Sequence, residues 1–144
     1  MTSDRVARDY LRRAAARRLM LETLRGAGAY ADVVRESQDV VELVLKGALR
    51  FVGVDPPKRH DVHGVMGRFI DRFPGEWHHA LDELRESLDD LADDRAPAFY
   101  GDEERGIPAS ELFGEEDARK AMGIADRLLD LYRRLLGAAR EPGG

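Results

Sequence analysis

The chain has 144 residues and no cysteine, which suits one domain and excludes both disulfide bonds and thiolate metal sites. Charged residues make up 35% of the chain and the net charge is −5, which argues against a protein that coats nucleic acids with its whole surface. The charged N-terminal residues do not resemble a signal peptide, and no apolar run approaches the roughly 18 residues of a membrane span. We therefore expect a cytoplasmic protein that has no contact with a membrane.

Two long helices are predicted in the first third of the chain. Apolar residues recur at three- and four-residue steps over residues 4–25 and again over residues 30–51. Gly26-Ala27-Gly28 separates the two segments, and glycine tolerates the left-handed conformation found just past a helix end. Because the turn is so short, the two helices should form an antiparallel hairpin.

Three more helices are expected, over about residues 61–72, 76–92 and 115–136. Prolines and glycines separate the first two of them from their neighbours at Pro56-Pro57 and Pro74-Gly75. The last of the three begins with acidic residues, which the helix dipole favours in a first turn.

A long irregular loop is predicted over residues 93–114, where periodicity fails and five prolines and glycines interrupt the chain. Residues 139–144 should form a frayed tail. The expected fold class is all-α: a single domain over residues 1–144, built as an antiparallel up-and-down bundle of four long helices plus one short helix.

Charge is distributed unevenly along this predicted bundle. Residues 4–26 contain seven arginines against three carboxylates, and residues 82–94 contain seven carboxylates against Arg85 alone. One interpretation is that two solvated helix faces attract each other across the bundle. The other is that the arginines form a basic surface for phosphate backbones.

The second predicted helix carries a polar row with a four-residue spacing: Gln38, Glu42 and Lys46. This spacing places an amide, a carboxylate and an ammonium on one face in successive turns. Glu42 precedes Lys46, the favourable order for an ion pair worth about 0.3–0.5 kcal/mol on an exposed helix. Neutral residues flank the row, which indicates that it lies partly buried.

Together with its surroundings, this row resembles the HEPN family ("higher eukaryotes and prokaryotes nucleotide-binding"). The family pattern places G-x-Y before a helix with Q-x-x-x-E-x-x-x-K, then a glycine-proline turn, then a His-Asp pair. The matching residues are Gly28 and Tyr30, Gln38, Glu42 and Lys46, Gly53 and Pro57, and His60 and Asp61. Farther along, an Arg and Tyr element is matched by Arg95 and Tyr100, and the "D-A" that opens the last helix by Asp117-Ala118. The resemblance covers residues 7–136.

The resemblance implies a bundle of four to five helices that usually forms a homodimer and often works beside a minimal nucleotidyltransferase. Many relatives belong to toxin–antitoxin or other defence systems. Some are metal-independent ribonucleases that use Arg-x(4–6)-His from each protomer, and others lack this motif and serve as binding or scaffolding modules. No cofactor is expected.

Candidate ribonuclease residues are Arg72, His78 and His79, because five and six residues separate the arginine from the two histidines. Histidine would move protons at the reacting oxygens and arginine would stabilise the phosphorane. With 20 arginines and 4 histidines in the chain, however, chance alone gives about two such pairs, and two are found. The histidines have no zinc-binding spacing, so no metal site is predicted.

The candidate nucleotide-binding or family-motif residues are Gln38, Glu42, Lys46, Arg59, His60, Asp61, Arg95 and Tyr100. In a structural role, Asp61 would cap a helix and His60 would bond Glu42 or Lys46. In a functional role, Lys46, Arg59, His60 and His63 would surround a pocket for a nucleotide phosphate. The pocket requires Lys46 and His60 to lie within reach of each other.

Three functions remain open at this point. The first is a homodimeric HEPN module that acts with a nucleotidyltransferase and binds nucleotide or RNA. The second is an active ribonuclease toxin of the same fold, and the third is a structural adaptor that binds only protein through its basic first helix and its long loop.

Overall fold

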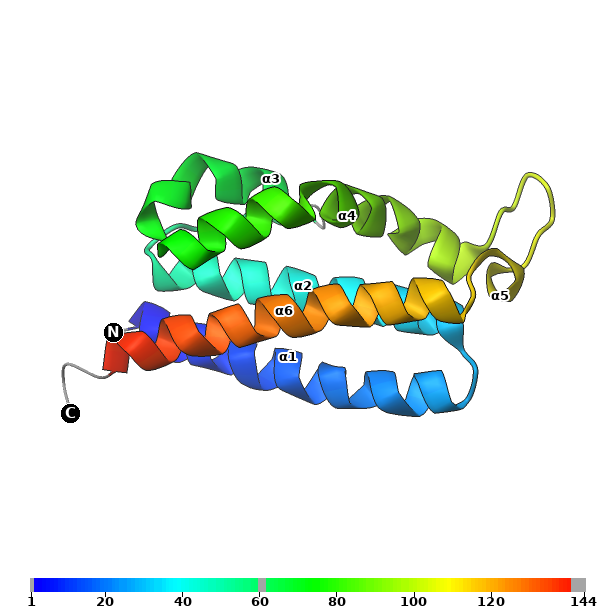
Figure 1. The fold of residues 1–144 in the computed structure, drawn as a ribbon, viewed down its shortest axis with the longest axis horizontal. Coiled ribbons are helices and arrows are strands. Elements are labelled where there is room, and N and C mark those ends of the chain that lie inside the picture. Colours follow the sequence, from blue (N-terminus) through cyan, green and yellow to red (C-terminus); the bar gives the residue numbers. More distant parts are fainter. Residues whose placement is uncertain (1, 60–61, 141–144) are drawn as a thin grey trace.

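The computed structural model describes residues 2–59 and 62–140 (Figure 1). Within these ranges the chain forms helices and no strand, which confirms the predicted all-α bundle. The elements are α1 (Thr2–Gly26), α2 (Tyr30–Phe51), α3 (His63–Met66), the 3-10 helix η1 (Gly67–Arg72), α4 (Gly75–Tyr100), α5 (Ala109–Leu112) and α6 (Glu115–Arg140). None of the described helices is both long enough and apolar enough to cross a membrane.

The four long helices run alternately up and down, and α2 and α6 lie in the middle of the bundle (Figure 1). α2 packs against α1, α4 and α6, and α6 also packs against α1 and α4. α1 and α4 therefore lie on opposite sides of the α2–α6 pair and run in the same direction.

This arrangement corrects one interpretation of the charge pattern. The basic segment in α1 and the acidic segment in α4 do not attract each other across the bundle, because the central helices separate them. α1 instead forms ion pairs with the central helices, from Arg17 to Glu36 of α2 and from Arg18 to Asp126 of α6. Glu83 of α4 pairs with Arg127 of α6 at 2.7 Å.

α2 is the central helix of the core, with buried residues on most of its circumference. At Gly47 it approaches α1 and α6 so closely that a β-carbon would lie 2.8 Å from Tyr10 Cβ and would overlap the Tyr132 hydroxyl. Tyr132 donates this hydroxyl to the carbonyl oxygen of Ala7 and so joins α6 to α1. Burial raises the pKa of Tyr132 above its ordinary value.

The predicted irregular loop starts too early. α4 does not end at Ala92 but continues to Tyr100, with Pro97 inside its last turns. Ala98 is buried, so packing holds this stretch in helical form despite the proline. The residue after the helix is Gly101, whose positive φ of 75° suits glycine and ends the helix.

Other predicted boundaries also need correction. The segment that follows Gly101 contains a short backbone bridge between Asp102 and Ile107 and then α5. The expected single helix over 61–72 is α3 followed by η1, with a kink at Phe69. α6 extends to Arg140, beyond the predicted start of the tail at residue 139, and residues 141–144 lie outside the described residues.

Replacing Gly47 with alanine should lower the free energy of unfolding by about 2–3 kcal/mol, because the new methyl group has no space between α2 and Tyr132. Gly123→Ala is the control: this exposed helical site has no described atom near a new β-carbon, and alanine should stabilise it by about 0.5–1 kcal/mol. Urea denaturation measures both. Equal effects of the two substitutions would contradict the packing at Gly47.

Candidate functional site

The polar row of α2 has the predicted ion pair. Lys46 Nζ lies 2.8 Å from Glu42 Oε2, and each side chain is only 16% exposed. Gln38, one turn before Glu42, is buried. The row is therefore partly enclosed by the bundle, and its charges lie where a hydrogen bond is stronger than in water.

The pocket predicted around Lys46 stays a prediction. His60 and Asp61 lie outside the described residues, so the structure gives no distance from them to Lys46 or Arg59. His63, the fourth residue assigned to this pocket, begins α3 and lies with its Nε2 atom 2.5 Å from Asp89 of α4. Its observed partner therefore belongs to α4.

Arg95 and Tyr100 both lie in the last part of α4, beside the first half of α2. Arg95 pairs with Asp39 at 3.7 Å, next to Gln38 in the sequence. Tyr100 is exposed and contacts Phe99 edge to face, with 4.8 Å between ring centroids. The structure thus brings Arg95, and not Tyr100, next to the polar row.

The arginine and histidines proposed for RNA cleavage make separate contacts. Arg72 donates to the carbonyl oxygen of Val52 at 3.0 Å, which ties η1 to the end of α2. The ring of His78 lies 3.1 Å from the carbonyl oxygen of Phe73, within the turn that leads into α4. Among the described residues, no hydrogen bond or ion pair joins Arg72 to His78 or His79.

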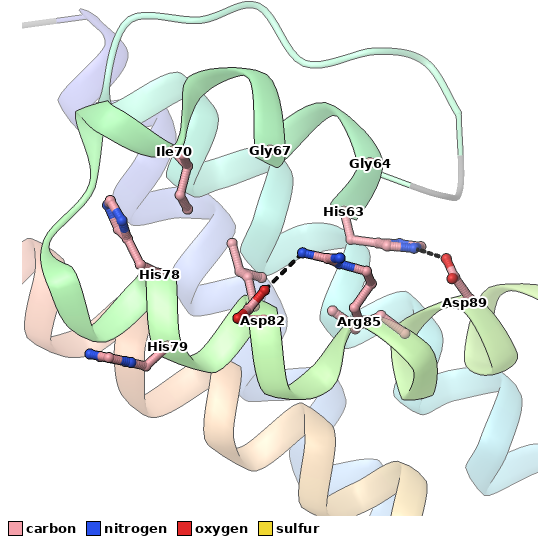
Figure 2. A pocket seen from close by; sticks show the side chains of 11 residues that line it. His63, Gly64, Gly67, Ile70, His78, His79, Asp82, Arg85 and Asp89 are labelled. Atoms are coloured by element: carbon pink, nitrogen blue, oxygen red, sulfur yellow. Dashed lines mark hydrogen bonds and ion pairs between the residues drawn. The ribbon is translucent and has the colours of Figure 1, made fainter.

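A groove of about 710 Å³ separates α4 from the α3–η1 segment (Figure 2). Its accessible apolar surface comes from Ile70 of η1 and Leu81 of α4, which are both half-buried. Gly64 and Gly67 line the α3–η1 wall beside Ile70, where the absence of side chains keeps the groove wide. The volume is within the range of typical small-molecule sites, which is roughly 300–1,000 Å³.

Polar side chains surround this apolar surface (Figure 2). Figure 2 shows a hydrogen bond across the groove, between His63 and Asp89, and an ion pair along α4, between Asp82 and Arg85 at 2.8 Å. The remaining polar lining residues are His78 and His79, near the start of α4. The groove therefore offers an apolar surface for a planar ring, cationic donors for an anion and carboxylate acceptors for amino or hydroxyl groups.

The groove was not predicted from the sequence. There, His78 and His79 are candidate partners of Arg72, and Asp82, Arg85 and Asp89 belong to a solvated acidic face. The sequence does contain one relevant signal, the two glycines Gly64 and Gly67 in the short segment before these residues. Among the described residues, no three His, Asp or Glu side chains gather as metal ligands.

The side of α4 that faces α6 carries a partly buried carboxylate, Asp94. Burial raises the pKa of Asp94 above its ordinary value, and the negative charges of Asp90, Asp117 and Asp93 raise it further. Asp90, Asp94 and Asp117 also line a small cavity between α4 and α6. At neutral pH the ionised Asp94 therefore destabilises this part of α4, because it is partly buried and lies near other carboxylates.

These features define a small all-helical bundle with a charged row on its central helix and a polar groove beside α4. The model of the HEPN domain family matches residues 7–135, and the chain belongs to this family. The resemblance seen in the sequence is thereby confirmed. Comparisons with curated proteins and with solved structures each gave no match. Membership supports, at the level of the family, a module associated with nucleotides or RNA.

Replacing Arg72 with alanine should lower the free energy of unfolding by about 0.5–1 kcal/mol, because the hydrogen bond to the Val52 carbonyl is lost. Arg68→Ala is the matched control, since Arg68 is an exposed arginine of the same 3-10 helix without a described partner. It should stay within about 0.5 kcal/mol of the parent chain in urea denaturation. A larger effect at Arg68 would refute the structural role of Arg72.

Asp94→Asn should raise the melting temperature at about pH 7, by about 1–3 °C. The folded state binds the Asp94 proton more tightly than the unfolded chain, so the ionised carboxylate destabilises the fold at neutral pH. The gain should vanish as the pH falls below the ordinary pKa of aspartate, about 3.9. Asp71→Asn, at an exposed site in η1, should show neither effect.

Proposed function

We propose that this HEPN domain binds a nucleotide, free or at the end of an RNA, in the groove between α4 and the α3–η1 segment. The observation that carries the proposal is the composition of the groove, which combines an apolar surface with both cationic and carboxylate groups. The assignment agrees with the association of the family with nucleotides and RNA.

The groove can take up an anion at little cost. Arg85 and Asp82 are both largely exposed, so their ion pair contributes at most about 1 kcal/mol to stability. A phosphate can therefore replace Asp82 as the partner of Arg85, in a charge-assisted and bidentate arrangement. The base would lie on Ile70 and Leu81, and Asp89 would accept a hydrogen bond from an amino or hydroxyl group.

Further parts of the proposal rest on family membership. The chain would act as a homodimer, together with a minimal nucleotidyltransferase, in a toxin–antitoxin or other defence system. Catalysis receives less support, because Arg72 and His78 are engaged in structural contacts with backbone carbonyls. The proposed function is therefore a binding and interaction module.

The test fills the groove without removing any of its polar groups. Gly67 has helical backbone angles and open space around a new β-carbon, so Gly67→Phe should fold normally and occupy the groove. We expect it to weaken binding of AMP or ATP at least about tenfold in isothermal titration calorimetry, and Arg85→Ala to weaken it about tenfold. Gly26→Phe, at an exposed position at the end of α1, is the matched control and should bind like the parent chain.

Two results would contradict this assignment. If neither mononucleotide binds the parent chain, or if Gly67→Phe binds as well as Gly26→Phe, the groove is not the nucleotide site. A parallel incubation with RNA separates the alternatives. RNA cleavage that is lost in Arg72→Ala and in His78→Ala/His79→Ala would identify a ribonuclease, and silence in both assays would leave a protein adaptor.

A further inference from the structure

One end of the bundle carries most of the exposed large apolar side chains. Among the described residues five such side chains are exposed, and three of them lie where α4 ends and α5 follows (Figure 1). Phe99 and Tyr100 of α4 are 55% and 63% exposed, and Leu112 of α5 is 37% exposed. α5 packs against α4, so these residues form one surface region, which we call the aromatic patch.

The aromatic patch already holds one guanidinium group. The guanidinium carbon of Arg35 lies 4.4 Å from the centroid of the Phe99 ring. A ring face attracts a cation, and arginine takes this position more often than lysine. No described cation lies over the ring of Tyr100, which meets Phe99 edge to face. Tyr100 therefore offers a second arginine position to a partner molecule.

Carboxylates border the aromatic patch. Residues 99–112 contain four carboxylates against Arg105 alone. Three of them, Glu103, Glu104 and Glu111, are exposed, and no hydrogen bond or ion pair reaches them in the part of the chain that the structure describes. We call these three residues the acidic rim. Its charge attracts a cationic partner and repels the phosphates of a nucleic acid.

The hairpin that carries Glu103 and Glu104 is fixed beside the end of α4. Asp102 and Ile107 exchange two backbone hydrogen bonds, of 2.8 and 2.9 Å. A β-carbon at Gly101 would overlap the carbonyl oxygen of Ile107, so the hairpin packs directly against the residue that follows Tyr100. A partner therefore meets a preformed surface, which lowers the entropy cost of binding.

We infer that the aromatic patch and the acidic rim dock an arginine-rich segment of a partner protein. One arginine of this segment stacks on Tyr100, and others form charge-assisted hydrogen bonds with Glu103 and Glu104. An aliphatic side chain of the segment covers Leu112. Arginine and aromatic residues are enriched in protein interfaces for these reasons. The inference names a partner chemistry for the interaction role in the proposed function and rests on that role.

Two peptides of equal charge distinguish stacking from simple charge attraction. The probes are fluorescein-labelled Arg-Leu-Arg-Arg-Leu-Arg and its lysine counterpart, with binding to the full chain followed by fluorescence anisotropy at about 50 mM salt. The arginine peptide should bind about three- to tenfold more tightly. Phe99→Ala/Tyr100→Ala should abolish this preference. Leu19→Ala/Met20→Ala removes two exposed apolar side chains of α1 and should retain it.

Neutralising the acidic rim tests the charge contribution. Glu103→Gln/Glu104→Gln should weaken the binding of both peptides about three- to tenfold. Asp71→Asn/Glu86→Gln is the matched control, since it removes the same charge at exposed positions in η1 and in the middle of α4. Its effect should stay below about twofold, because salt screens these distant charges. Circular dichroism checks the fold of every variant.

The docking surface is separate from the nucleotide groove. Phe99 lies ten residues beyond Asp89, the last groove residue of α4, which is about 15 Å along the helix. Phe99→Ala/Tyr100→Ala should therefore bind AMP like the parent chain. Failure of the peptides to bind leaves the groove untouched, and failure of AMP to bind leaves the docking surface untouched.

Three results would overturn the inference. The first is a parent chain that binds neither peptide at low salt. The second is a preference for arginine that survives the loss of both rings. The third is a labelled oligoadenylate that binds the parent chain and loses affinity in Phe99→Ala/Tyr100→Ala, because this would assign the aromatic patch to nucleic acid.

Discussion

The close contact between α2 and α6 determines the rest of the structure. Gly47 has no side chain, so Tyr132 of α6 and Tyr10 of α1 reach the backbone of α2, and the Tyr132 hydroxyl then bonds to Ala7. Because the two central helices touch, α1 and α4 are held on opposite sides of them. This packing keeps the arginines of α1 apart from the carboxylates of α4. It also fixes the position of α4, which borders the groove on one side and α6 on the other.

Most of the fold could be predicted because it depends on local patterns. α2 begins and ends where its apolar period predicts, at Tyr30 and Phe51, with glycines of positive φ beyond both ends. The end of α4 could not be predicted, since Pro97 resembles a helix breaker. Proline removes only its own N–H, and the burial of Ala98 provides the tertiary contact that keeps the last turns helical.

Part of the candidate site could likewise be predicted from the sequence, and part could not. The pair of Glu42 and Lys46 could be predicted from a four-residue spacing within one helix, and the structure contains it. The groove could not be predicted, because its width depends on where a kink at Phe69 places the α3–η1 segment relative to α4. The contact of His63 with Asp89 spans 26 residues, and no periodicity encodes such a distance.

The crowded carboxylates of α4 lower the stability of the folded chain. Carboxylates spaced three and four residues apart repel each other by about 0.2–0.5 kcal/mol per pair. Burial is the main cause of the raised pKa of Asp94, and this repulsion raises the pKa further. Two arginines of α6 neutralise part of the helix, Arg134 at Glu76 and Arg127 at Glu83, and His63 forms a hydrogen bond with Asp89 on the groove side. Among the described residues, no hydrogen bond or ion pair reaches the other four carboxylates of residues 82–94, which are Glu86, Asp90, Asp93 and Asp94. The repulsion among these carboxylates therefore stays uncompensated in the part of the chain that the structure describes, and it lowers the stability of α4 at neutral pH.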